Sequence, residues 1–383
     1  MFFLIASMIV GIAASAVTIK TLIGYTTLSW WVKTLVSLMI IFCWFGHNAV
    51  WYLRHNQMVS LSCYSLYSTI AYIGLGFGFI LLALLIMRDF GWFTLYGFAK
   101  TAKISWYKQV DPYNFYYLNR ANLITVGISC LLVIWGIYEA VKFPEIKELT
   151  IYDAKIKESV KIVQMNDLHI NRTTSVKKIE NLVERINKLN PDVVVLVGDI
   201  VDERKPELLS EQLSALAQLK TKFGIYTVFG NHDFYSGLFI WLQKFIDYGL
   251  GPLFNNGAQI NDNIYIAGVP DKSIAQAFPQ MKINLPQALT GNKNNLYTIL
   301  LSHTPKFTDE KISGIDLQLS GHTHGGQIFP FHFLVKSANK YLAGLYQEDG
   351  YKVYVSRGAG YWGPPIRLFA PSDITIINLK PKK

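Results

Sequence analysis

The sequence predicts a chain of two parts, with four transmembrane helices in residues 1–142 followed by an α/β domain in residues 143–383. Three acids and nine Lys or Arg precede Phe143, whereas 23 acids and 27 bases lie from there onward. Hydrophobic residues make up 51% of the 383, which is high for a soluble protein. In the second part, short β-branched runs alternate with segments of helical spacing, as in layered α/β domains.

Four apolar stretches predict the membrane helices, because a helix needs roughly 20 apolar residues to cross the hydrocarbon core. These stretches are residues 2–18, 34–53, 68–87 and 121–141. A signal peptide is the alternative for the first, since Ala14-Ser15-Ala16 resembles a cleavage site, although no Lys or Arg precedes it. The aromatic loop 89–119 is typical of an interfacial belt or a surface helix.

Basic residues favour a membrane surface as partner but leave the orientation open. The net charge of +10 lies mostly in the loops of the first part, and the second part has no basic cluster typical of nucleic-acid binding. By the positive-inside rule, the inner loops hold seven Lys or Arg if the α/β domain lies outside and six if it lies inside. The three cysteines form no C-x-x-C pair, which argues against a disulfide framework or a thiolate metal site.

The first two strands of the α/β domain are predicted at "SVKIVQM" and "PDVVVLV", on either side of a helix. That helix begins near Ser175 and has apolar residues at helical spacing, namely Val176, Ile179, Leu182, Val183 and Ile186. Later strands are predicted at "GIYTVF", "NIYIAGV", "LYTILL", "DLQLS", "YKVYVS" and "DITIINL". This order predicts a layered α/β domain with central sheets.

Polar side chains follow five of these strands directly. They are Asp167, His169, Asp199, Asp202, Asn231, His232, Asp233, His303, His322 and His324. Five of the eight histidines in the chain are among them. Because ligand sites in open α/β sheets lie just beyond the carboxyl ends of the strands, we expect these groups to converge at one edge.

The spacing within "NDLH" and "GHTHGG" favours metal binding. Residues i and i+2 of an extended segment project to the same side, so Asp167 with His169, and His322 with His324, are each expected to address one centre. The glycines of the second motif let the backbone pass close to it. Carboxylate, imidazole and amide ligands suit Mn, Fe or Zn, and about seven such groups indicate two divalent ions that share a carboxylate.

Five ordered motifs, D-x-H, GD-x-x-D, GNH-D, a distal His and GH-x-H, resemble those of the calcineurin-like metallophosphoesterases over residues 161–379. "GHTHGGQ", "AGLY" and the late stretch "SRGAGYWGPPIRLFAPSDITIINL" are similar to a branch of membrane-anchored or exported bacterial members. The resemblance implies a four-layer α/β/β/α sandwich. It also implies hydrolysis of a phosphoric ester or pyrophosphate with two divalent ions, Mn first and Fe or Zn as alternatives.

The resemblance further assigns roles to the site residues. Asp167, His169 and His324 would hold the first ion, Asn231, His303 and His322 the second, and Asp199 would bridge them. His232 would be a catalytic residue that faces the substrate phosphate, with Asp233 orienting its ring. Asp202 would position a ligand or the loop.

A membrane-anchored member of this family is expected to act on a membrane-borne phospho-lipid. The architecture is similar to bacterial enzymes that hydrolyse the pyrophosphate of UDP-diacylglucosamine to a lipid sugar phosphate and UMP in lipid A synthesis. That activity would place the domain on the cytoplasmic side of a bacterial inner membrane, although the best-known such branch carries arginine where this chain has His232. The alternatives are an exported phosphodiesterase or phosphatase acting on envelope phospholipid or polymer, and a non-enzymatic membrane scaffold.

Two apolar segments near the motifs have two interpretations each. Residues 329–336 predict either a core strand or hydrophobic turn, or a rim that takes acyl chains. Residues 235–254 predict a helix that packs on the sheet through Phe239, Leu242, Phe245 and Ile246, so that Trp241 is the residue expected to reach a bilayer.

Overall fold

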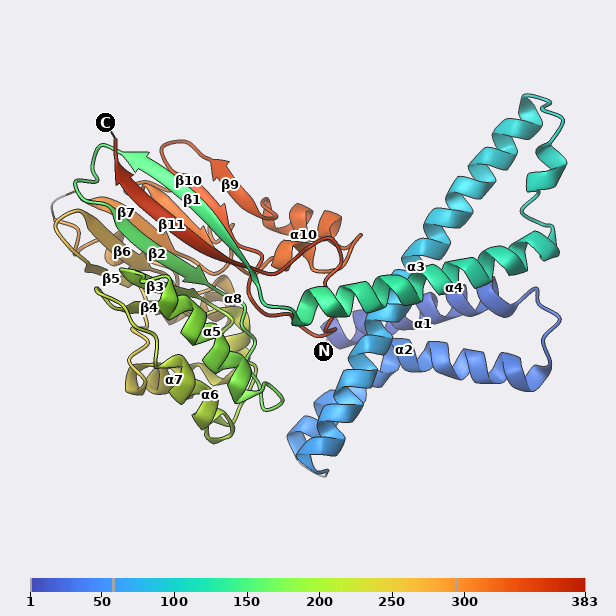
Figure 1. Cartoon of the computed structure of the whole chain (residues 1–383), viewed down its shortest axis with the longest axis horizontal. Helices are drawn as coiled ribbons and strands as arrows, with labels where there is room; N and C mark the ends of the chain where they lie inside the picture. The colour runs from blue at the N-terminus through green and yellow to red at the C-terminus, as the bar shows by residue number, and fades with distance from the viewer. Residues whose placement is uncertain (1, 57–58, 294, 383) are drawn as a thin grey trace. The chain divides into compact units, whose positions relative to one another are not determined.

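The computed structural model describes residues 2–56, 59–293 and 295–382, which fold as two compact units (Figure 1). The first unit runs to Val141 and also includes Gly363–Leu368 from near the end of the chain. The second unit begins at Lys142 and contains the rest. Six residues from near the end of the chain therefore fold together with the predicted membrane region.

The first unit is built from helices, namely α1 (Phe2–Ile23), α2 (Trp30–Asn56), α3 (Leu61–Thr101), η1 (Tyr107–Val110) and α4 (Phe115–Val141). Among the described residues, three helices are long and apolar enough to cross a membrane: α2 over Trp30–Val50, α3 and α4. Helix α1 contributes a shorter apolar stretch, Ser7–Ile23. Three of the predicted spans are therefore confirmed as candidates, and a count of four stays a prediction.

Helix α3 extends beyond the predicted apolar span, and its charged residues Arg88 and Asp89 are hydrogen-bonded inside the unit. The Arg88 guanidinium donates to Asp89 Oδ1 at 2.6 Å and to Oδ1 of Asn122 in α4 at 2.7 Å. Asn122 in turn donates from Nδ2 to the carbonyl of Thr21 in α1 at 2.9 Å. The helix continues to Thr101 instead of ending at residue 87, so the first part of the aromatic segment 89–119, predicted as an interfacial belt or a surface helix, is a continuation of α3.

The six residues Gly363–Leu368 pack between α3 and α4. The Arg367 N–H donates to the carbonyl of Gly136 in α4 at 2.9 Å. A Cβ at Gly76 of α3 or at Gly136 would collide with the Ile366 side chain, so both positions require glycine for this close approach. Arg367 is fully buried.

The second unit contains two sheets. The first has the order β1-β11-β2-β3-β4, with strands β1 (Glu145–Asp153), β11 (Asp373–Pro381), β2 (Val160–Met165), β3 (Val193–Val197) and β4 (Ile225–Val228). The second has the order β5-β6-β7-β8-β10-β9, with strands β5 (Asn256–Gln259), β6 (Ile264–Gly268), β7 (Tyr297–Leu301), β8 (Leu317–Ser320), β10 (Lys352–Val355) and β9 (Gly344–Gln347).

Parallel pairing brings the important strand ends to one edge of each sheet. Strands β2, β3 and β4 are parallel to one another, and so are β6, β7, β8 and β10. The outer strands β5 and β9 pair antiparallel with their neighbours. The polar residues that follow β2, β3 and β4 therefore leave the first sheet on the same side, and those that follow β7 and β8 do so in the second sheet.

The two faces of β3 explain why it is apolar at every position. Val193, Val195 and Val197 belong to a core that also contains Ile266 and Leu319 of the second sheet, so the two sheets pack face to face. The other residues of β3, Val194 and Leu196, pack against three helices, α5 (Val176–Lys188), α6 (Ser210–Leu216) and α7 (Asn231–Asp247) (Figure 1). A strand buried on both faces needs no polar side chain.

Short helices complete the second unit. On the other face of the second sheet, Tyr265, Ala267 and Leu300 pack with Ala288 of α9 (Leu285–Ala288) and with loop residues. The remaining elements are η2 (Pro206–Leu209), α8 (Lys272–Ala277), η3 (Pro279–Met281), η4 (His324–Gly326) and α10 (His332–Asn339).

The face that α7 buries agrees with the predicted one only in part. Phe245 is buried and Leu242 packs against the same core, as predicted. Leu238 and Trp241 are buried as well, whereas Phe239 and Ile246 are more than half exposed. The Trp241 indole Nε1–H donates to the Glu203 carbonyl at 2.7 Å. With its one polar atom satisfied, Trp241 packs in the core, and the prediction that it reaches a bilayer is wrong.

We expect Trp241→Ala to lower the free energy of unfolding by about 3–5 kcal/mol, because it leaves a large cavity and removes the hydrogen bond to the Glu203 carbonyl. Phe239→Ala, on the exposed side of the same helix, is expected to change it by less than about 0.5 kcal/mol. Denaturant unfolding of the full chain in detergent measures both. Equal shifts would show that the assignment of the two faces is wrong.

Candidate metal centre

The structure places the predicted site residues in five loops that follow strands. Asp167 and His169 follow β2, Asp199 and Asp202 follow β3, and Asn231, His232 and Asp233 open α7 after β4. His303 follows β7, and His322 and His324 follow β8. Their ligand atoms form three neighbouring clusters, Asp167–His169–His324, His169–Asp199–His232 and Asp199–His303–His322, each within 4.8 Å.

The backbone that presents these residues is left-handed, not extended. The φ angles are +54° at Asp167, +49° at His169, +52° at Asp199, +70° at His322 and +49° at His324. The expectation that i and i+2 project together as on a strand is therefore wrong in its geometry. Asp167 and His169 do meet in one cluster, whereas His322 and His324 belong to two different clusters, in contrast to the expectation that they address one centre. Such conformations cost of order 1–3 kcal/mol each for non-glycine residues and cluster at functional sites.

Backbone hydrogen bonds hold these loops in place. The Asp167 N–H donates to the Gly198 carbonyl at 3.0 Å, and the His169 N–H donates to the Asp199 carbonyl at 3.1 Å. Gly321 lets the loop after β8 approach closely, because a Cβ there would collide with Asn166 and with the Asp167 carboxylate. The ligand loops of the two sheets are thus fixed against each other.

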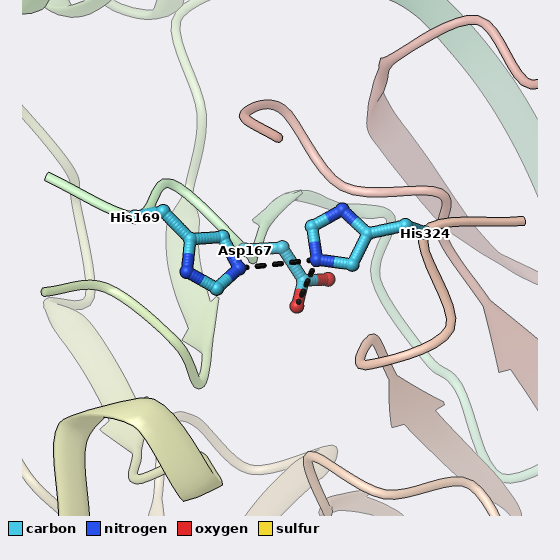
Figure 2. A group of neighbouring side chains, drawn as sticks. All are labelled: Asp167, His169 and His324. Atoms are coloured by element: carbon cyan, nitrogen blue, oxygen red, sulfur yellow. Dashed lines mark hydrogen bonds and ion pairs between the residues drawn. The ribbon is translucent and has the colours of Figure 1, made fainter. Parts of the chain in front are cut away.

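The first cluster joins Asp167, His169 and His324 (Figure 2). The two Nε2 atoms of His169 and His324 lie 3.0 Å apart, and His324 Nε2 lies 3.5 Å from Asp167 Oδ1. All three side chains are at least nine-tenths buried. Two nitrogens bound to one cation at right angles would lie about 3 Å apart, since metal–nitrogen bonds measure roughly 2.1 Å.

The cluster of Asp199, His303 and His322, called the second cluster below, contains a buried nitrogen that protein groups leave unsatisfied. His303 is fully buried, and its Nδ1 lies 2.9 Å from the Val197 carbonyl, to which it must be the donor. Nε2 has no hydrogen-bond partner among the described residues and lies 3.2 Å from Asp199 Oδ2. A lone pair that faces a carboxylate at this distance is stabilised by a cation between them.

Asp199 connects the two clusters. Its Oδ2 lies 3.2 Å from His303 Nε2 and 3.8 Å from His169 Nε2, while its Oδ1 accepts the His232 N–H at 2.8 Å. Asn231 completes the second cluster, with its Oδ1 3.0 Å from His322 Nδ1. The donor set of carboxylates, imidazoles and one amide therefore fits two divalent cations that share Asp199.

Asp202, not Asp233, is the carboxylate that orients the ring of His232. Asp202 Oδ1 accepts from His232 Nδ1 at 2.6 Å, and its Oδ2 accepts from His169 Nδ1 at 2.9 Å. Asp233 instead accepts the backbone N–H groups of Ile200, Val201 and Gly230, each at 2.9 Å. The role predicted for Asp233 is therefore corrected: its carboxylate fixes the loop after β3, because it is aimed at main-chain donors.

The charges of the site follow from burial and from these contacts. Burial, and then the neighbouring His303, lowers the pKa of His322 to about 4, so its imidazole is neutral near neutral pH. Burial by itself would raise the pKa of Asp202, but His232 and His169 outweigh it and hold that pKa well below its ordinary value. Burial acts to lower the pKa of His232, and Asp202 and Asp199 together raise it to about 9. The two carboxylates therefore favour the protonated form of His232.

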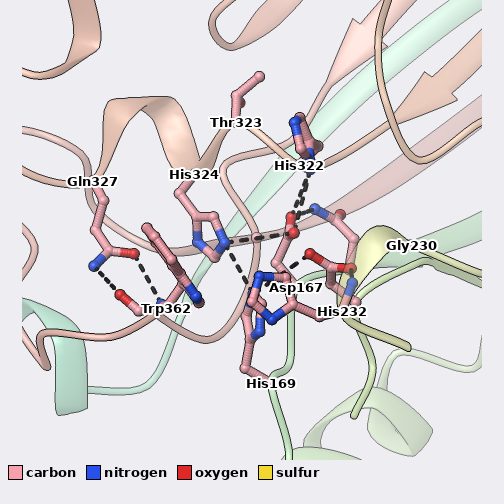
Figure 3. A network of polar contacts seen from close by, with 12 residues as sticks. Asp167, His169, Gly230, His232, His322, Thr323, His324, Gln327 and Trp362 are labelled. Carbon is pink, nitrogen blue, oxygen red and sulfur yellow. Dashed lines mark hydrogen bonds and ion pairs between the residues drawn. The ribbon is translucent and has the colours of Figure 1, made fainter. Parts of the chain in front are cut away.

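Three residues beside the site were not predicted from the sequence. Asp271 follows β6, and its Oδ2 accepts from the hydroxyl of Thr304, the neighbour of His303, at 2.5 Å. The rule that polar groups gather at strand ends could have found it. Gln327 and Trp362 interact through two hydrogen bonds near His324 (Figure 3), and no spacing rule joins two residues so far apart in the chain.

We expect the full chain, purified in detergent with Mn²⁺ and freed of excess ion, to retain about two ions per molecule. Asp199→Ala is expected to lose most of this metal, because it removes the carboxylate between the clusters. Asp262→Ala, an exposed acid in the turn between β5 and β6, is the control and should keep it. Elemental analysis measures the content, and full retention by Asp199→Ala would contradict the bridging position.

Comparison with known proteins agrees with this geometry. Residues 160–326 match the family model of calcineurin-like phosphoesterases. An uncharacterised metallophosphoesterase of Campylobacter jejuni is 36% identical over 274 residues, covering 68% of this chain and 70% of that protein. An uncharacterised metallophosphoesterase of Helicobacter pylori is 38% identical over 267 residues, covering 68% of this chain and 71% of that protein.

The name of a similar animal protein refers to a membrane. The Danio rerio "transmembrane protein with metallophosphoesterase domain" is 33% identical over 276 residues, covering 68% of this chain and 63% of that protein. Together with the apolar helices, this similarity indicates association with a membrane. The chain belongs to the calcineurin-like metallophosphoesterases and is a metal-dependent phosphoester hydrolase.

Proposed function

We propose that the protein is a membrane-bound phosphoesterase that uses two divalent ions, Mn²⁺ first, to hydrolyse a phosphorylated lipid. The observation that carries this proposal is the position of Asp199 Oδ2 between His303 of one ligand cluster and His169 of the other. Every position that the family motifs assign to a ligand holds a side chain able to bind a cation. This disfavours the non-enzymatic scaffold.

The residues support a division of labour in the reaction. When bound, the two cations supply the charge that activates water and stabilises the phosphoryl group. His232 has Nδ1 engaged by Asp202, which leaves Nε2–H to act toward the substrate. As water attacks phosphorus and the ester P–O bond breaks, the Nε2 proton passes to the departing oxygen.

Exposed apolar side chains support a lipid as substrate. Phe331, Phe333, Leu334 and Phe369 are between 41% and 71% exposed. Residues 329–331 form a turn that leads into α10, so the expected hydrophobic turn is present and the core strand is not. Helix α10 begins against this loop, since a Cβ at Gly326 would collide with the His332 backbone. A rim for acyl chains next to the metal centre, the other expectation, agrees with these positions.

Within this class, the first substrate to test is UDP-diacylglucosamine, whose pyrophosphate would give a lipid sugar phosphate and UMP. This assignment requires the α/β unit to face the cytoplasm from a bacterial inner membrane. An exported enzyme that acts on envelope phospholipid or polymer is the second candidate. A reporter fused after Lys383 that is active only outside would remove the nucleotide-lipid assignment.

We expect His232→Ala to lower kcat by about 10²- to 10⁴-fold, the usual contribution of a general acid. Asp202→Asn is expected to lower it by about 10- to 100-fold, because asparagine keeps only one of the two acceptor oxygens and loses the charge, so only one of the rings of His232 and His169 keeps an orienting acceptor. Both variants should keep near wild-type metal content, in contrast to Asp199→Ala. Turnover and elemental analysis on the same preparations test this, and metal loss by His232→Ala would show that it is a ligand.

The substrate class is tested with the full chain in vesicles supplied with Mn²⁺. UDP-diacylglucosamine, a phosphatidyl phospholipid and an aryl phosphate are compared by phosphate or UMP release. We expect a lipid substrate to be preferred and all activity to disappear with a chelator and return with Mn²⁺. Preference for the water-soluble aryl phosphate would contradict a lipid substrate, and activity that survives chelation would contradict the metal centre.

A further inference from the structure

We propose that Trp362 is a specificity-determining residue that contacts the leaving group of the substrate and favours a planar, unsaturated ring there. This inference rests on the proposed function, because it names the group that departs beside His232. The indole lies against the ring of His232, with ring centroids 5.8 Å apart and planes at 70°. It is 47% exposed, so nearly half of its surface is open to a ligand.

A second aromatic ring flanks His232. Tyr235, one turn later in α7, has its ring centroid 5.9 Å from that of His232, with planes at 63°, and the residue is 56% exposed. The proposed proton donor thus lies beside two half-exposed aromatic rings. A group that receives the proton of His232 must come within hydrogen-bond distance of it, and therefore next to these rings.

The position of Trp362 is fixed by a side chain of the ligand loop. The Gln327 amide donates from Nε2 to the Trp362 carbonyl at 2.8 Å, and its Oε1 accepts the Trp362 N–H at 3.0 Å (Figure 3). Gln327 is buried and lies three residues after His324. One amide that satisfies both backbone groups of Trp362 fixes its main chain to the loop that carries a predicted metal ligand.

Planarity of the ligand follows from the chemistry of the rings. An exposed aromatic ring gains most from stacking with another flat, unsaturated ring, such as an aryl group or a nucleobase. A saturated ring of similar size buries comparable apolar area but cannot stack. The two kinds of leaving group should therefore differ in their dependence on Trp362.

The test compares phenyl phosphate with cyclohexyl phosphate, which match in ring size and differ in planarity. In the full-length protein with Mn²⁺, Trp362→Ala is expected to lower kcat/KM for phenyl phosphate by about 10- to 100-fold, mainly through KM. For cyclohexyl phosphate the loss should stay within about threefold. Trp362→Phe should restore most of the preference, and Gln327→Ala should reproduce part of its loss. Tyr152, on β1, is an aromatic residue that is 57% exposed. Tyr152→Ala is the matched control and should leave kcat/KM unchanged for both substrates.

Binding of the non-hydrolysable phenylphosphonate and cyclohexylphosphonate, measured by calorimetry with Mn²⁺, separates this inference from the proposed function. A preference of the wild type for phenylphosphonate that disappears in Trp362→Ala supports the inference even if neither ester is hydrolysed. Absence of turnover with metal bound would count against the proposed function alone. Equal binding of the two phosphonates by the wild type, or equal losses for both in Trp362→Ala, would overturn the role of Trp362.

Discussion

The burial of the Asp199 carboxylate among imidazoles is the interaction on which the rest of the α/β unit depends. A charge that is 2% exposed is costly unless it is paired and hydrogen-bonded. Here one oxygen accepts a backbone N–H, and the other lies between His303 of one sheet and His169 of the other. The strand order, the face-to-face packing of the sheets and the left-handed loops all serve to bring these groups together around it.

The backbone strain of the ligand loops is offset by packing elsewhere in the fold. Five predicted ligands have positive φ, and none of them is glycine. Strained loops of this kind persist when tightly packed elements around them hold them in place. Here β3 is covered by helices on one face and by the second sheet on the other. Asp233 adds to this by accepting three backbone donors, which explains why a carboxylate in the motif does not orient the ring beside it.

Predictions from the sequence succeeded where one short segment decides the outcome and failed where distant segments compete. The apolar run of β3 and the helix that buries Ile179, Leu182 and Ile186 were predictable, because periodicity reports local burial. The face of α7 was predictable only in part, because Leu238 and Trp241 are buried where Phe239 and Ile246 were expected, and the Trp241 indole finds its acceptor in the distant Glu203 carbonyl. The length of α3 was not predicted either, and its Arg88 is hydrogen-bonded to Asn122 in another helix, a partner that periodicity does not reveal.

The sequence by itself determined which polar groups gather beside one another, because each motif places a polar side chain directly after a strand and parallel strands end at one edge. It also determined that part of the chain suits a membrane, since apolar length is a local property. Only the tertiary structure decided that Asp202 holds His232, that Gln327 holds Trp362, and that Gly363–Leu368 folds with the helices. These are contacts between residues far apart in the chain, and their partners are chosen by packing and hydrogen bonding in three dimensions.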